Sequence, residues 1–179
     1  MKRKSDKTQI GQGFQFIVSP PGILKIFEFV ALLISLSCIA AFMSTLNNTR
    51  GTWNFFIFCV ACTWIFTIVS FLFFTVGGHK ILHQVNWVLA MAIIYVIFTV
   101  MLLISAGILA DNTRSYKASG LCDSWKSVHK DIECNNLVVA VVFAFTAFIL
   151  YIVDSSFHFW LSVVATDSGS ELETAEMEL

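Results

Sequence analysis

Charged side chains are scarce in this sequence. Only 13% of the 179 residues are Asp, Glu, Lys or Arg, and 57% are hydrophobic, whereas an ordinary soluble domain carries about 25% charged residues. This shortage of charge excludes an ordinary soluble chain, and the long apolar segments leave no room for a separate soluble domain. The composition therefore predicts one compact bundle in a membrane, with a tail at each end.

The sequence also lacks the motifs of common catalytic and ligand sites. It contains no phosphate-binding loop, no zinc-type spacing of cysteine and histidine, and no nucleophile with a base and an orienting group. Its apolar segments hold too few polar residues for a transport pathway. We therefore expect a protein that is not an enzyme and that has no cofactor, no metal site and no nucleic-acid partner.

Four long apolar segments are present, at residues 23–46, 53–76, 87–110 and 137–153. About 20 apolar residues in a helix cross the hydrocarbon core of a membrane, and an open sheet would leave backbone groups unsatisfied in lipid. The predicted fold class is an all-α membrane protein, a bundle of four transmembrane helices in up-down order. Residues 1–22 form a basic tail and residues 165–179 an acidic tail in this prediction.

The fourth apolar segment is short, since 17 residues from Leu137 to Val153 rise only about 25 Å. The span is expected to take in residues 154–157 or more, which places Asp154 near the headgroups of the inner leaflet. Residues 155–164 are too apolar for a free tail. We expect them to continue the helix through the membrane interface, a half-apolar environment that suits Trp160 and His158.

Basic residues around the first segment predict the orientation of the chain. The residues before or at its start are Lys2, Arg3, Lys4, Lys7 and Lys25, while only Arg50 follows it. The connection 111–136 holds further basic residues, but the cluster beside the first helix decides the orientation. Both termini are therefore predicted to be cytosolic. Because no small-residue cleavage pattern follows the first segment, we expect a retained signal-anchor helix.

The connection 111–136 is polar and contains Cys122 and Cys134. On the exoplasmic side, where the orientation places it, the compartment is oxidising. We expect a disulfide bond between the two cysteines, and two free thiols are the alternative. Asn47 begins a glycosylation motif on the same side, which we expect to lie too close to the membrane for use.

Two stretches resemble the MARVEL domain. The first is Pro20-Pro21-Gly22 followed by Lys25 and Glu28, which is similar to the family's entry into its first helix. The second is Tyr151, Asp154 and Phe157, which is similar to its last helix. The resemblance covers about residues 20–164. It is nearest to the plasmolipin, myelin-and-lymphocyte-protein and chemokine-like-factor branches, whereas the two-cysteine loop is similar to that of occludin.

The resemblance implies a non-enzymatic organiser of membranes in vesicle trafficking, membrane apposition, or cell contact and fusion. It implies a plasma-membrane or secretory and endosomal location. The partners would be membrane lipids and other membrane proteins, or further copies of the chain. One alternative is a cell-junction component that acts through its disulfide-closed second exoplasmic loop. Another is a quinone-linked thiol oxidoreductase, since Cys59 and Cys62 form a CxxC pair in the second segment.

Small residues recur at helical spacing in all four segments, and small residues let helices approach closely in lipid. We expect them to pack helices within the bundle, with contact between copies of the chain as the alternative. The residues are Ser37 and Ala41; Cys59, Thr63 and Thr67; Ala106 and Ala110; Ala140 and Ala144.

Lys25, Glu28 and Asp154 are expected to lie at one depth near the inner leaflet. Because the first and last helices of an up-down bundle are commonly neighbours, Lys25 can pair with Asp154. The alternative is that Lys25 extends to lipid phosphate and the two acids are solvated. At the C-terminus, Met177, Glu178 and Leu179 form an apolar-any-apolar end of the kind that a PDZ domain binds by strand addition.

Overall fold

The computed structural model describes residues 17–46, 51–76, 87–128 and 134–177, with side chains placed in residues 17–46, 51–76, 90–127 and 134–160. The described residues form five helices: α2 (Pro20–Leu46), α3 (Gly51–Val76), α5 (Trp87–Ala118), α6 (Leu121–Val128) and α7 (Asn135–Met177). Pro20 suits the first helical position of α2, because proline has no N–H and its φ angle is already helical. Four helices are long and apolar enough to cross a membrane, as predicted.

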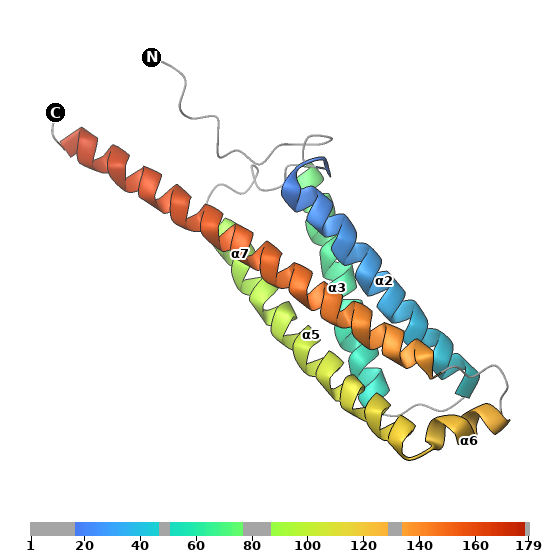
Figure 1. Cartoon of the computed structure of the whole chain (residues 1–179). Coiled ribbons are helices and arrows are strands. Elements are labelled where there is room, and N and C mark those ends of the chain that lie inside the picture. Colours follow the sequence, from blue (N-terminus) through green and yellow to red (C-terminus); the bar gives the residue numbers. More distant parts are fainter. Residues whose placement is uncertain (1–16, 47–50, 77–86, 129–133, 178–179) are drawn as a thin grey trace.

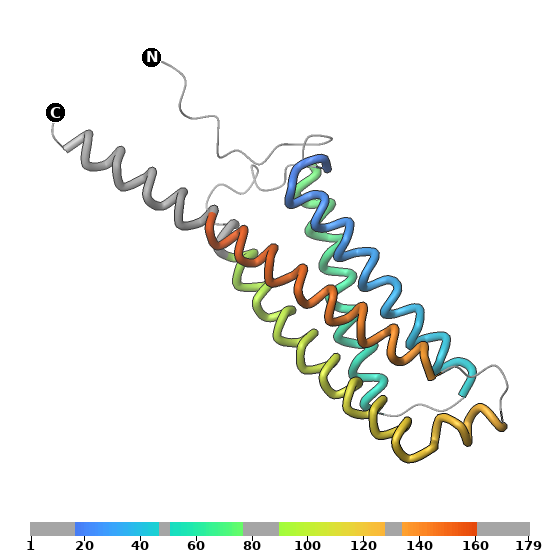
Figure 2. The backbone as a smooth tube through the Cα atoms, in the orientation of Figure 1, coloured from blue at the N-terminus to red at the C-terminus, as the bar shows by residue number. Residues whose placement is uncertain are grey.

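The four long helices pack side by side, and α6 lies at one end of the bundle (Figure 1). Around the bundle, α2 contacts α3 and α7, while α5 contacts α3 and α7. The backbone tube shows the antiparallel order of the four spans (Figure 2). The predicted class, an all-α bundle of four spanning helices, is confirmed, and we place the protein in a membrane as a multi-pass protein.

The bundle interior holds small and polar residues beside large apolar ones, and the outer surface of the spans is apolar as well. Ser35, Thr63, Ser70 and Ser105 are buried. The outer surface of all four long helices carries large aliphatic and aromatic side chains, among them Phe27, Phe58, Ile65, Ile93 and Ile149, each more than half exposed. In water such a surface would drive association, so the arrangement suits lipid as the surrounding solvent.

Helix α5 ends later than the sequence predicted. We expected the span to stop at Ala110 and a loop to follow through residue 136, but α5 continues to Ala118 and α6 forms within the expected loop. Thr113 and Tyr116 remain buried against the bundle, which favours continued helix. The turn comes at Gly120, whose φ of 71° favours glycine.

Helix α7 also extends further than expected. Its 43 residues run to Met177, so the backbone of most of the predicted acidic tail is helical. The stretch Glu171–Met177 is rich in Glu, Ala, Leu and Met, which are strong helix formers. The composition of this segment, which we described only as an acidic tail, thus favours helix.

Candidate functional site

A buried ion pair joins the first and last spans. Lys25 lies in the second turn of α2, and its Nζ is 2.7 Å from Oε2 of Glu28 and 2.5 Å from Oδ2 of Asp154 on α7. The hypothesis of a Lys25–Asp154 pair thus agrees with the structure. The alternative, a lysine that extends to lipid phosphate beside solvated acids, is contradicted, because none of the three residues is more than 2% exposed.

Two tyrosine rings enclose the Lys25 ammonium group. Its Nζ lies 4.0 Å from the ring centroid of Tyr95 on α5 and 5.2 Å from that of Tyr151 on α7. At such distances the negative face of an aromatic ring attracts a cation. Sequence reasoning missed Tyr95. The signal that could have found it is a tyrosine in the middle of an aliphatic span, where its hydroxyl needs a partner.

His158 completes the cluster, one helical turn after Asp154. Its Nε2 is 3.7 Å from Oδ1 of Asp154, and its ring stacks on Tyr95 and Phe74 with centroids 5.3 Å and 5.8 Å apart. We expected His158 at the depth of the membrane interface, which stays a prediction, but its side chain is buried inside the bundle and does not face a wet surface. The spacing of four residues puts His158 on the same inward face as Asp154.

We call Lys25, Glu28, Asp154 and His158 the ion-paired cluster. It holds two carboxylates against one lysine, so its formal charge is negative when His158 is neutral. Removing charges from water is costly, and only their mutual attraction offsets that cost. The cluster therefore depends on keeping α2, α5 and α7 together.

A second polar contact joins α3 to α7. The hydroxyl groups of Thr67 and Tyr151 are in direct contact, and the Tyr151 hydroxyl also donates to the Thr63 carbonyl oxygen at 3.2 Å. Thr63 and Thr67 each bond back to the carbonyl of the residue four before them. Together with Cys59 these threonines are buried, so the predicted stripe on α3 lies inside the bundle.

The other predicted small residues divide into two groups. Ala106, Ala140 and Ala144 are fully buried and Ala110 is half-buried. Ser37 and Ala41 are exposed instead, so the expectation that they pack helices within the bundle is wrong.

The reason for the Ser37 error is the register of α2. Its inward face carries Ser35, Ile39 and Phe42, at the spacing of three and four that shares one side of a helix. Ser35 makes the inter-helix contact that we assigned to Ser37, donating to the Ala140 carbonyl oxygen at 2.8 Å.

A disulfide and an aromatic cluster close the opposite end of the bundle. The predicted bond between Cys122 and Cys134 is present, with Cα atoms 5.9 Å apart. It ties α6 to the start of α7. Trp125 of α6 packs edge-on against Tyr116, Phe42 and Trp53, with ring centroids 5.4, 5.9 and 6.3 Å away. The expected loop is thus a short helix seated on the bundle.

The CxxC pair offers little access to a substrate. Cys59 is fully buried and Cys62 is half-buried, and both are free thiols. Reactive cysteines occupy partly exposed, electropositive sites. This geometry favours packing over thiol chemistry.

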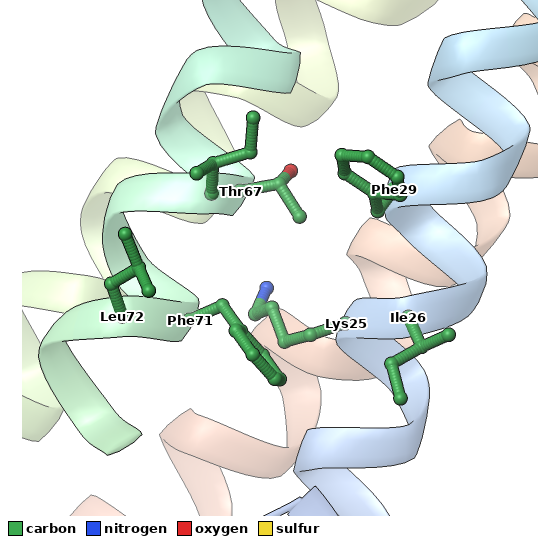
Figure 3. A pocket seen from close by; sticks show the side chains of 7 residues that line it. Lys25, Ile26, Phe29, Thr67, Phe71 and Leu72 are labelled. Carbon is green, nitrogen blue, oxygen red and sulfur yellow. The ribbon is translucent and has the colours of Figure 1, made fainter. Parts of the chain in front are cut away.

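A cavity of about 240 Å³ opens between α2 and α3 next to the ion-paired cluster (Figure 3). Its walls are Ile26, Phe29, Ile68, Phe71 and Leu72, together with Lys25 and Thr67. In Figure 3 the Lys25 side chain reaches from α2 between these apolar side chains toward α3. The Lys25 stem lines the cavity while its nitrogen bonds to the carboxylates.

Three predicted features lie outside the described residues: residues 1–16 of the basic tail, the glycosylation motif at Asn47, and the Glu178 and Leu179 end proposed for a PDZ domain. For Met177 only the backbone is described, as the last residue of α7. Within the part of the chain that the structure describes, no three His, Cys, Asp or Glu side chains are grouped so that they could hold a metal ion.

Comparison with known proteins gives one match. The family model of the MARVEL membrane-associating domain matches residues 16–157. This range contains α2, α3, α5 and α6, and α7 as far as Phe157, which includes Asp154 of the ion-paired cluster. No curated protein and no solved structure matches the chain.

Proposed function

The chain belongs to the MARVEL family, and on that premise we propose that it is a non-enzymatic organiser of membranes in vesicle trafficking, membrane apposition, or cell contact and fusion. The observation that carries the proposal is the family match, which extends over most of the chain and all four spans.

The geometry supports this proposal. Three sets of buried polar groups bond across helices: Lys25 to two carboxylates, Tyr151 to two threonines, and Ser35 to the backbone of α7. They hold helices together, and the outer surface that remains is apolar. Such a bundle acts on its surroundings through lipid contacts and packing with other membrane proteins.

Depletion and rescue in polarised epithelial cells tests the proposal. Loss of the protein is expected to slow delivery of an apical membrane cargo to the cell surface, and a copy tagged at the N-terminus should restore it and label vesicles. A copy with Asp154→Lys should not restore delivery, because it places two cations together in the bundle. The control is Asp111→Asn, a charge change at an exposed site of α5. Unchanged cargo delivery and unchanged cell contacts after depletion would contradict the proposal.

A second candidate is a junction component that acts through the disulfide-closed segment. The observation in its favour is that α6 is held in one position by the disulfide between Cys122 and Cys134 and by the packing of Trp125 against Tyr116. Asp123, Ser124, Lys126 and Ser127 of α6 are exposed. A fixed, charged helix of this kind suits recognition of a partner on an apposed membrane.

Localisation separates the two candidates. Concentration of the tagged protein at cell contacts, lost when Asp123 and Lys126 are exchanged, would favour the junction role. Enrichment on vesicles that the exchange does not alter would favour trafficking.

A further inference from the structure

A groove runs between α5 and α7 at the end of the bundle that carries the disulfide. Its volume is about 610 Å³, within the range typical of ligand sites. One wall is Ala110, Thr113 and Ala118 of α5, and the other is Val138, Val141 and Val142 of α7. The groove lies apart from the ion-paired cluster, which is near the other end of the same helices.

Two cations stand at the groove. Arg114 and Lys117 of α5 line it and are both exposed. They are three residues apart and therefore neighbours on one face of the helix. Within the described residues neither side chain forms an ion pair, although Asp111 lies one turn before Arg114. Positive charge at this groove is thus left without a partner from the described chain.

The cations and the apolar walls occupy different depths. The apolar span of α5 ends at Ala110, and Lys117 is about 10 Å further along the helix. Ala110, Val141 and Val142 therefore face the start of the hydrocarbon, while Arg114 and Lys117 reach the headgroup layer. The groove matches a molecule with a negative head and an apolar chain.

We propose that this groove binds a membrane lipid with an anionic headgroup. Arg114 and Lys117 bind the headgroup, and one acyl chain lies along Val138, Val141 and Val142. A soluble anion would leave the valine wall unused, and a second copy of the chain would bury apolar helix but leave both cations uncompensated. On the predicted orientation this face meets the exoplasmic leaflet, where anionic lipid is the minority species. A site built for it selects that lipid from a neutral background.

Native mass spectrometry of the full chain in detergent micelles tests the proposal. The probes are phosphatidylglycerol and phosphatidylcholine with identical acyl chains. The wild-type chain should retain phosphatidylglycerol about tenfold more strongly, because hydrogen bonds to charged groups contribute on that scale. Arg114→Gln with Lys117→Gln should abolish the preference. The matched control is Lys126→Gln, an exposed cation of the same end that does not line the groove.

A second pair of variants tests the apolar wall. Val142→Trp fills the groove and should lower retention of both lipids several-fold, whereas Val153→Trp should not. The two valines are on α7 with similar exposure, 54% and 50%, and Val153 lies outside the groove. Disulfide mapping of each variant confirms that the bundle has formed.

Four results would overturn the proposal. The first is equal retention of the two lipids by the wild-type chain. The second is a loss of the phosphatidylglycerol preference in Lys126→Gln as large as in the double variant, which would mean that general surface charge causes the preference. The third is competition by millimolar inorganic phosphate, which would assign the cations to a soluble anion. A dimer that the Val142→Trp variant disrupts, with no change in lipid retention, would likewise assign the groove to a second copy.

Discussion

Among single residues, Lys25 has the most demanding environment in the bundle. Its ammonium group is shielded from solvent and is balanced by Glu28, Asp154 and two tyrosine rings. Removing one partner from a buried ion pair leaves an uncompensated charge, which costs far more than the pair itself contributes. The predictions at this scale follow from that asymmetry.

Lys25→Met is expected to destabilise the protein by about 3–5 kcal/mol, because two buried carboxylates lose their cation. Denaturant unfolding of the purified protein in micelles measures the change. Lys126→Met, at an exposed site on α6, should stay within about 0.5 kcal/mol of wild type. Equal effects of the two substitutions would show that Lys25 is not held by the cluster.

Exchanging the charges of Lys25 and Asp154 tests their coupling. Lys25→Glu and Asp154→Lys should each lower surface expression, and the double variant should recover most of the loss. A double variant whose loss equals the sum of the single losses would mean that the two residues are not coupled.

At the scale of helices, the contact of α3 with α7 depends on hydroxyl groups. Thr67→Val removes the group that meets Tyr151 and should cost about 1 kcal/mol, within the range measured for hydrogen bonds between membrane helices. Thr146→Val is the matched control, because the Thr146 hydroxyl is exposed and bonds only to the Val142 carbonyl of its own helix. Unfolding in micelles measures both. Indistinguishable values would contradict the inter-helix role.

The disulfide gives α6 its position. Cys122→Ser with Cys134→Ser should cost about 3 kcal/mol, since the bond closes a short loop in the unfolded chain. Amide hydrogen exchange should accelerate in α6 and leave the centre of α3 protected. Cys38→Ser, a half-buried free thiol, is the control. Non-reducing mass mapping that finds both loop thiols free in surface protein would overturn the assignment.

For the whole molecule, the length of α7 is the feature that bears on its position in the membrane. Its 43 residues rise about 65 Å, roughly twice the hydrocarbon thickness. The helix must therefore leave the hydrocarbon along its course. We predict that it emerges near Asp154, so that Trp160, whose side chain is 60% exposed, lies at headgroup level.

Brominated lipids measure that depth. The emission of Trp160 is the difference in fluorescence between the wild-type chain and the Trp160→Phe variant. This emission should be quenched by bromines near the headgroup and little by bromines at the acyl-chain centre. Trp64→Phe provides the comparison, because Trp64 lies in the middle of α3 and should respond to acyl-centre bromines. Strong acyl-centre quenching of the Trp160 component would mean that the helix is drawn deeper and that Asp154 lies within the hydrocarbon.

The sequence by itself determined that this chain crosses a membrane four times. That result needs only the length and polarity of each segment, because the bilayer imposes both on any helix that spans it. The same local information placed Lys25 and Asp154 near one end of the bundle and predicted the disulfide.

Only the tertiary structure decided which face of each helix turns inward. Inward and outward faces are both apolar in lipid, so the pattern of hydrophobic residues does not distinguish them. For this reason the sequence selected Ser37 where Ser35 makes the contact, missed Tyr95, and did not place the His158 side chain inside the bundle. Helix register and the packing of α2, α5 and α7 bring Lys25, Tyr95, Asp154 and His158 to one point, and that arrangement is a property of the assembled bundle.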